Sequence, residues 1–138
     1  MSTVLAQVLA QLDVVLKANA PAGCQVFRDR AEAESRAEAP CIEVQARELQ
    51  VESFSAETDK HVLEVELRIH VRAEPGTPAA EEIHQAVHGP IVTDATLAAL
   101  CESRRYQDAT FNLAEADVTA LDKLCRYRFT YLIPQSTL

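Results

Sequence analysis

The sequence predicts an α+β protein in which a mostly antiparallel sheet of four to five strands carries two main helices on one face. Near the N-terminus, apolar residues recur every three or four positions, which is typical of an amphipathic helix. In the middle of the chain and near its C-terminus, apolar and polar residues alternate, which is typical of half-buried strands. Prolines, glycines and polar stretches separate these segments, so the expected order is α-β-β-β-α-β-β.

Length and composition favour one globular domain. The 138 residues suffice for one hydrophobic core but not for two, so a single domain over residues 1–138 is expected. The net charge of -8 opposes nucleic-acid binding through phosphate contacts, which needs clustered Lys and Arg. No tryptophan and only 5% aromatic residues leave few surfaces on which bases could stack.

The first helix is expected over residues 3–19, with Ser2 or Thr3 as its N-cap. A proline and a glycine follow, and a short strand is expected from Cys24. Residues 28–40 alternate alanine with charged side chains and are expected to form a solvated loop or a frayed turn of helix.

A long antiparallel hairpin is expected next. Its first strand begins at Pro40, and a change of apolar parity predicts a bulge or bend near Arg47. A polar turn at residues 56–60 leads to the second strand, in which five apolar residues alternate with polar ones up to Arg72. The polar face of this hairpin is expected to meet solvent or a neighbouring subunit.

The second helix is expected to begin with Thr77 as its cap and Pro78 in its first turn. Its apolar stripe should face the sheet, and Gly89-Pro90 is expected to stop or kink it. Helical structure is then expected to resume before the next strand. The stripe consists of Ala80, Ile83 and Val87.

The C-terminal part predicts a second hairpin, with strands over residues 106–113 and 124–133. Parity places Tyr127 on one face and both neighbouring arginines on the other. This pattern favours a half-buried strand over a nucleic-acid patch.

The chain lacks the common signatures of enzymes and cofactor sites. Three glycines cannot build a dinucleotide or phosphate-binding loop, and no nucleophile elbow or zinc-protease helix is present. The four cysteines form no C-x-x-C pair. We therefore expect no enzymatic activity and no cofactor.

One weak metal candidate remains, with two interpretations. Glu81, His84 and His88 are spaced three and four residues apart, so all three project from one side of the second helix, as metal ligands can. Alternatively, this side faces away from the apolar stripe and is the solvated surface of the helix, and this interpretation is preferred. The metal site belongs to a second functional hypothesis, a small ligand-binding or metal-binding α+β module.

The order of features resembles a known family. Val26-Phe27-Arg28-Asp29-Arg30, the strand opened by Pro40-Cys41-Ile42, and the closing alternating strand at 124–133 follow one another between amphipathic helices. Over nearly its whole length the chain resembles the phage tail terminators, the lambda-type minor tail protein U family.

The resemblance implies a structural virion protein that forms a ring, usually a hexamer. Such a ring caps the tail tube, ends its polymerisation and provides the surface to which the head joins. The expected partners are other copies of the chain, the tail tube protein and a head completion protein, while DNA passes through without specific binding. No signal peptide or membrane contact is expected, so the predicted location is the host cytoplasm during assembly and then the virion tail.

Subunit contacts are expected in two places, the charged loop and the polar face of the long hairpin. The loop residues are Arg28, Arg30 and Arg36, and the hairpin residues are Glu64, Glu66, Arg68, His70 and Arg72.

Overall fold

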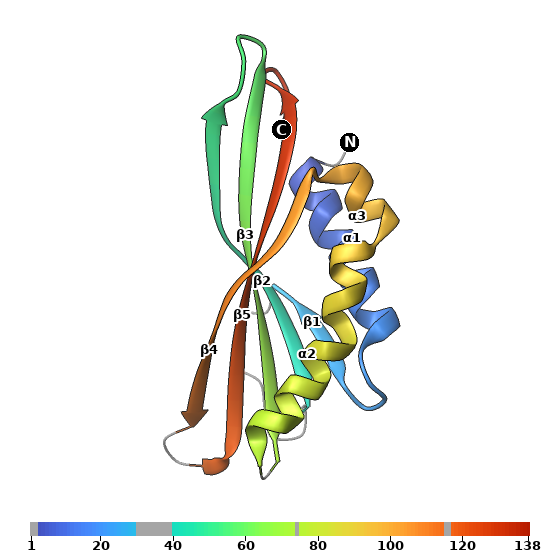
Figure 1. The fold of residues 1–138 in the computed structure, drawn as a ribbon, viewed down its shortest axis with the longest axis vertical. Coiled ribbons are helices and arrows are strands. Elements are labelled where there is room, and N and C mark those ends of the chain that lie inside the picture. Colours follow the sequence, from blue (N-terminus) through green and yellow to red (C-terminus); the bar gives the residue numbers. More distant parts are fainter. Residues whose placement is uncertain (1–2, 30–39, 74, 115–116) are drawn as a thin grey trace.

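The computed structural model describes residues 3–29, 40–73, 75–114 and 117–138, and it confirms the predicted α+β class and order (Figure 1). A short third helix between the second helix and the last hairpin confirms the expected resumption of helical structure. The elements are α1 (Val4–Asn19), β1 (Gln25–Arg28), β2 (Cys41–Ser53), β3 (Thr58–Arg72), α2 (Gly76–Thr93), α3 (Ala95–Leu100), β4 (Ser103–Ala114) and β5 (Asp117–Pro134).

The five strands form one sheet in the order β1-β2-β3-β5-β4. β1 pairs with β2 in parallel, and the other three pairings are antiparallel. The register of β2 on β3 shifts between Ala46 and Glu48, which confirms the bulge expected near Arg47. The parity change therefore keeps apolar side chains on one face along the whole strand.

The three helices lie on the same side of the sheet, so the molecule has two layers (Figure 1). One hydrophobic core fills the space between these layers. Its largest fully buried side chains come from every helix and from β2, β3 and β5, and include Leu12, Leu16, Ile42, Leu63, Leu67, Ile69, Ile91, Leu97, Tyr127, Phe129 and Tyr131. We call the sheet face opposite the helices the open face.

The sheet extends past the helices at one end. In Figure 1 the β2–β3 hairpin and the end of β5 extend beyond the helices at the upper end of the molecule. β4 and the start of β5 reach the opposite end. The upper end of the sheet therefore lies beyond the helices, whereas at the lower end the start of α2 lies beside β3 and β5.

The predicted N-cap is correct for α1 and wrong for α2. The Thr3 hydroxyl accepts a hydrogen bond from the Ala6 N–H at 3.1 Å, which confirms Thr3 as the cap of α1. The prediction for Thr77 is wrong, because α2 begins at Gly76 after Pro75 and has no side-chain cap. A Cβ added to Gly76 would lie only 3.1 Å from the Leu121 side chain, so close packing on β5 favours glycine at this start.

The expected stop at Gly89-Pro90 is not observed, since α2 continues to Thr93. Pro90 lacks the N–H that would bond within the helix. Ile91, in the turn that follows, is fully buried, and its burial offsets the lost hydrogen bond. No helix in the described ranges has the length and apolarity needed to cross a bilayer.

Candidate functional site

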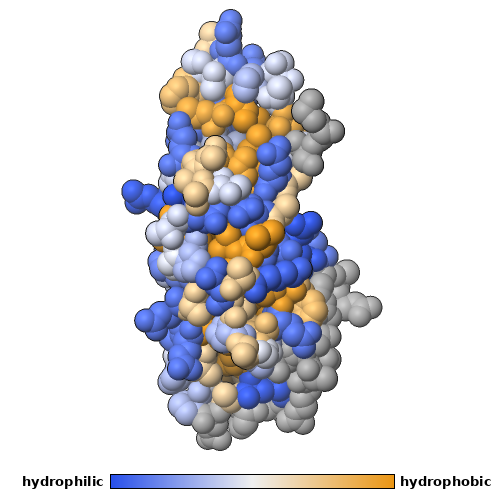
Figure 2. Space-filling model, turned by 90° about the vertical axis from the view of Figure 1, so that its right-hand side faces the viewer, coloured by the Kyte–Doolittle hydropathy of each residue, from blue (hydrophilic) through white to orange (hydrophobic). Residues whose placement is uncertain are grey.

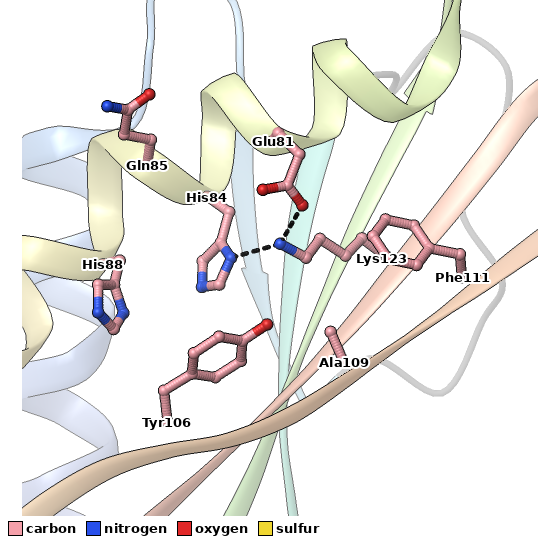
Figure 3. A pocket seen from close by; sticks show the side chains of 8 residues that line it. All are labelled: Glu81, His84, Gln85, His88, Tyr106, Ala109, Phe111 and Lys123. Atoms are coloured by element: carbon pink, nitrogen blue, oxygen red, sulfur yellow. Dashed lines mark hydrogen bonds and ion pairs between the residues drawn. The ribbon is translucent and has the colours of Figure 1, made fainter.

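A polar cluster lies between α2 and β5, within the otherwise apolar layer. Lys123 occupies a position on the helix-facing side of β5, between the buried Leu121 and Cys125, and is only 3% exposed. Its ammonium forms an ion pair with Glu81, and its Nζ lies 2.7 Å from Nδ1 of His84 (Figure 3). A buried charge needs such partners, because desolvation of an unpaired ammonium is costly.

The hydrogen bonds continue through Tyr127 to a second histidine. The Tyr127 hydroxyl lies 2.7 Å from Nε2 of His84 and 2.7 Å from Nδ1 of His88. A Lys123 ammonium only donates, so Nδ1 of His84 accepts, and the neutral ring carries its proton on Nε2. His84 then donates to Tyr127, and the Tyr127 hydroxyl donates to His88. We call these residues, with Glu81, the α2–β5 cluster.

The environment keeps His84 neutral. Burial lowers its pKa from 6.5 to about 4, and the nearby charges of Lys123 and His88 act in the same direction, while Glu81 opposes them. Burial likewise raises the pKa of Tyr127 well above its usual value. The cluster is therefore set to hold fixed hydrogen bonds near neutral pH rather than to release protons.

Aromatic rings and an open cavity border the cluster. The Tyr106 ring stands edge-on to His84 at 4.9 Å between centroids and stacks on Tyr127 at 5.3 Å. A cavity of about 390 Å³ lies above these side chains, between α2 and β4. Figure 3 shows Phe111 and Ala109 on its β4 side and Gln85 on its α2 side.

The preferred interpretation of His84 as a solvated residue is wrong, because its side chain is 5% exposed. α2 packs on β3, β5 and β4, so the side of the helix next to its apolar stripe also faces the sheet. Glu81 and His84 are separated by the Lys123 ammonium, which occupies the position where a metal ion would have to sit (Figure 3). Within the described ranges, no three His, Cys, Asp or Glu side chains are grouped as metal ligands.

Sequence reasoning missed Lys123 and Tyr127 as members of this cluster. Strand parity places Lys123 on the same face as Cys125 and Tyr127, and a lysine on the apolar face of a strand indicates a buried partner. Strand parity alone does not identify that partner, because the partner depends on where α2 crosses β5.

The residues predicted on the hairpin's polar face lie on the open face, where several are paired within the subunit. Glu66 lies 4.0 Å from Arg126, and His70 lies 2.5 Å from Asp122. The Arg68 guanidinium likewise forms an ion pair with the Glu43 carboxylate, at 4.0 Å between nitrogen and oxygen. Glu66 and His70 are buried, so this part of the face is less accessible than expected.

The remaining predicted contact residues lie in different places. Glu64 is half-buried on the open face, and Arg72 lies at the end of β3. Arg28 ends β1, with its Nε 3.9 Å from the Asp29 carboxylate. Arg30 and Arg36 lie outside the described residues.

Large apolar side chains are exposed at both ends of the sheet. Phe54, in the β2–β3 turn, is 60% exposed, and Leu113, near the end of β4, is 70% exposed. Leu49 and Val51 are exposed near Phe54, and Phe111 near Leu113. Figure 2 shows apolar side chains gathered in a band near the upper end of the helix-bearing side.

Comparison of the chain with protein-family models gives no match, and comparison with curated proteins gives none either. The functional argument therefore depends on the geometry of the cluster, the open face and the ends of the sheet.

Proposed function

We propose that the protein is a structural subunit of the tail-terminator type. Copies of the chain would form a closed ring that caps a phage tail tube, ends its polymerisation and provides the surface for head joining. The observation that best supports this proposal is the exposure of large apolar side chains at both ends of the sheet, at Phe54 and Leu113. Burial of such side chains between subunits stabilises an assembly by about 25 cal/mol per Å².

The two-layer architecture also suits a ring. A closed ring needs two different surfaces on each subunit, one of which contacts the other on the next copy. The sheet has two distinct edges, β1 with β2 on one side and β4 on the other. Among the described elements, the helices cover only one face, which leaves the open face for other components (Figure 1).

The acidic charge is consistent with a ring through which DNA passes. A net charge of -8 on each subunit gives the assembly a field that repels phosphate. DNA would then slide through the hole without being held.

Light scattering after size exclusion, over a wide concentration range, together with negative-stain electron microscopy, tests the proposal. We expect closed rings with a central hole, and addition of tail tubes should place these rings at tube ends. A chain that stays monomeric at every concentration and in the presence of tubes would contradict the proposal.

Substitutions at the sheet ends sharpen this test. Phe54→Ser and Leu113→Ser should weaken assembly or tube capping, because they remove exposed apolar area from the ends. Val14→Ser is the matched control, since Val14 is 56% exposed on α1, away from both ends. Equal behaviour of all three variants would show that the apolar ends do not contribute.

The cavity above the α2–β5 cluster supports a second candidate, a small ligand-binding module. Thermal-shift measurements with a panel of small carboxylates and aromatic compounds test it. A stabilising compound should lose its effect in Phe111→Ala, which opens the cavity wall. This change removes the ring 5.6 Å from Nζ of Lys123 but none of the hydrogen bonds of the cluster. A panel without any stabilising compound would leave only the assembly role.

A further inference from the structure

Four charged side chains form a row across the open face of the sheet. Glu48 on β2 is the partner of Glu64 on β3, Glu64 is the partner of Arg128 on β5, and Arg128 is the partner of Arg105 on β4. Residues directly opposite each other in antiparallel strands share a face. The row therefore has two carboxylates toward the β2 edge and two guanidinium groups toward the β4 edge.

Each outer charge of this row, Glu48 and Arg105, lies directly opposite a like charge. In the part of the chain that the structure describes, no ion pair involves any of the four side chains, and Glu48 only accepts a hydrogen bond from Gln50 at 3.2 Å. Neighbouring rows differ, because Glu66 pairs with Arg126 there. Like charges placed directly opposite each other destabilise a sheet, so each edge carries a pair that an external opposite charge would stabilise.

Both edges next to this row are accessible. β1 pairs with β2 only at Cys41–Val44, and residues 47–53 of β2 are exposed. The outer edge of β4 pairs with no described strand. Unpaired N–H and C=O groups along such edges can accept a further strand.

The strand directions allow two copies to join edge to edge. Three antiparallel steps separate β2 from β4, so the two edge strands run in opposite directions. A second copy in the same orientation would bring the start of its β4, residues 103–106, beside residues 47–50 of β2 as an antiparallel neighbour. Beyond Tyr106 the two edges must diverge, because β1 occupies the edge of β2 at Cys41–Val44. The open faces of both copies would lie on the same side, with Arg105 of one copy beside Glu48 of the next.

We propose that this contact, residues 103–106 of β4 in one copy against residues 47–50 of β2 in the next, is the interface between subunits. The inference rests on the proposed ring and specifies which surfaces build it. The positive charges of Arg105 and Arg128 in one copy neutralise the negative charges of Glu48 and Glu64 in the next copy. The contact is head-to-tail, because the β4 edge of each copy binds the β2 edge of the next copy.

Charge reversal at the two edges tests the interface by light scattering and native mass spectrometry. Glu48→Lys places a lysine beside Arg105 of the next copy, and Arg105→Glu places a glutamate beside Glu48. Each variant alone should associate at least about tenfold more weakly than the wild type. Neither side chain is buried, and circular dichroism checks that each variant folds.

A mixture of the two variants provides the decisive measurement. In the Glu48→Lys variant the new lysine meets only Arg105 of its own kind, and in the Arg105→Glu variant the new glutamate meets only Glu48. In the mixture the new lysine faces the new glutamate, and the unchanged Arg105 faces the unchanged Glu48. Assembly should therefore return only on mixing, in rings with an even number of alternating subunits. The double variant Glu48→Lys/Arg105→Glu should assemble by itself.

Two control variants make the same charge reversals on the helix layer, away from the sheet edges. Glu82→Lys on α2 and Lys17→Glu on α1 alter exposed positions on the helix layer and should leave association within about twofold of the wild type. Wild-type rings that persist in both edge variants, or variants that fail to recover on mixing, would overturn the edge assignment while the ring proposal stands. A wild-type chain without any self-association would overturn both.

Discussion

At the scale of single residues, Lys123 places a charge inside the layer between the helices and the sheet, where it is 3% exposed. Its ammonium stands on the apolar side of β5 and is held by Glu81 on one side and His84 on the other. Removing either partner would leave a buried charge with fewer contacts. The cluster thus fixes the position of α2 along β5. Apolar contacts are less directional, so they would fix this position less precisely.

The first prediction concerns the titration of His84. Its pKa in the native protein is about 4, against 6.5 as the ordinary value. Between these pH values the unfolded chain binds a proton that the folded chain does not, so the free energy of unfolding falls as the pH drops through this window. Above pH 6.5 this group has no effect. The loss is on the order of 3 kcal/mol by the time the pH reaches the native pKa.

Nuclear magnetic resonance of the imidazole carbons measures the pKa of His84 directly. Urea unfolding at neutral pH and near the native pKa then compares the wild type with His84→Gln, which should lose less stability between the two conditions. A midpoint for His84 near its ordinary pKa would contradict the assigned hydrogen bonds.

The second prediction concerns the hydroxyl at the centre of the cluster. Tyr127→Phe removes the acceptor for His84 and the donor to His88, and it leaves a buried N–H without a partner. The free energy of unfolding in urea at neutral pH should fall by about 1–3 kcal/mol. Tyr131→Phe is the matched control, because Tyr131 is buried on the same face of β5 and its hydroxyl bonds to none of the described residues. That control should change stability by less than about 0.5 kcal/mol.

At the scale of elements, the junction between α2 and α3 shows how a short helix is held. The Asp94 carboxylate accepts a hydrogen bond from the Leu97 N–H at 2.9 Å and one from the Gln11 side chain of α1 at 3.2 Å. Leu97 is fully buried, so the cap positions a core side chain as well as a helix end. A six-residue helix is unstable alone and depends on such contacts.

The third prediction follows from this junction. Asp94→Ala removes both hydrogen bonds and should lower the free energy of unfolding by about 1 kcal/mol or slightly more. Asp94→Asn keeps an oxygen that can cap the helix and should retain most of the stability. Urea unfolding of the three proteins at neutral pH measures the difference, and equal losses in both variants would show that the charge matters more than the cap.

At the scale of the whole molecule, one core joins all three helices to the sheet. Apolar side chains of α1, α2 and α3 pack together and on the same sheet face, without a second core among the described residues. The helix layer and the sheet therefore stabilise each other, and neither buries its apolar side alone.

The fourth prediction is that the chain unfolds in one cooperative step. Far-ultraviolet circular dichroism reports the helices. Tyrosine fluorescence reports the core side of β5, where Tyr127 and Tyr131 lie, together with the exposed Tyr106 of β4. The two urea transitions should coincide, because both signals depend on the same core. Separate midpoints would indicate two independent units and contradict the single domain over residues 1–138.

The sequence by itself determined the fold class, the order of elements and the face on which each strand residue lies. Strand parity is local, so the alternation around Tyr127 and the parity change near Arg47 could be interpreted without knowledge of neighbouring strands. The cap at Thr3 was predictable for the same reason, since a cap depends on residues within one turn.

The tertiary structure alone decided which distant residues meet. His84 and Lys123 are 39 positions apart, and their contact depends on where α2 crosses β5. The row from Glu48 to Arg105 exists only in the observed register of four strands. Such pairings arise from packing between segments far apart in the chain, where the burial of many side chains outweighs any local preference.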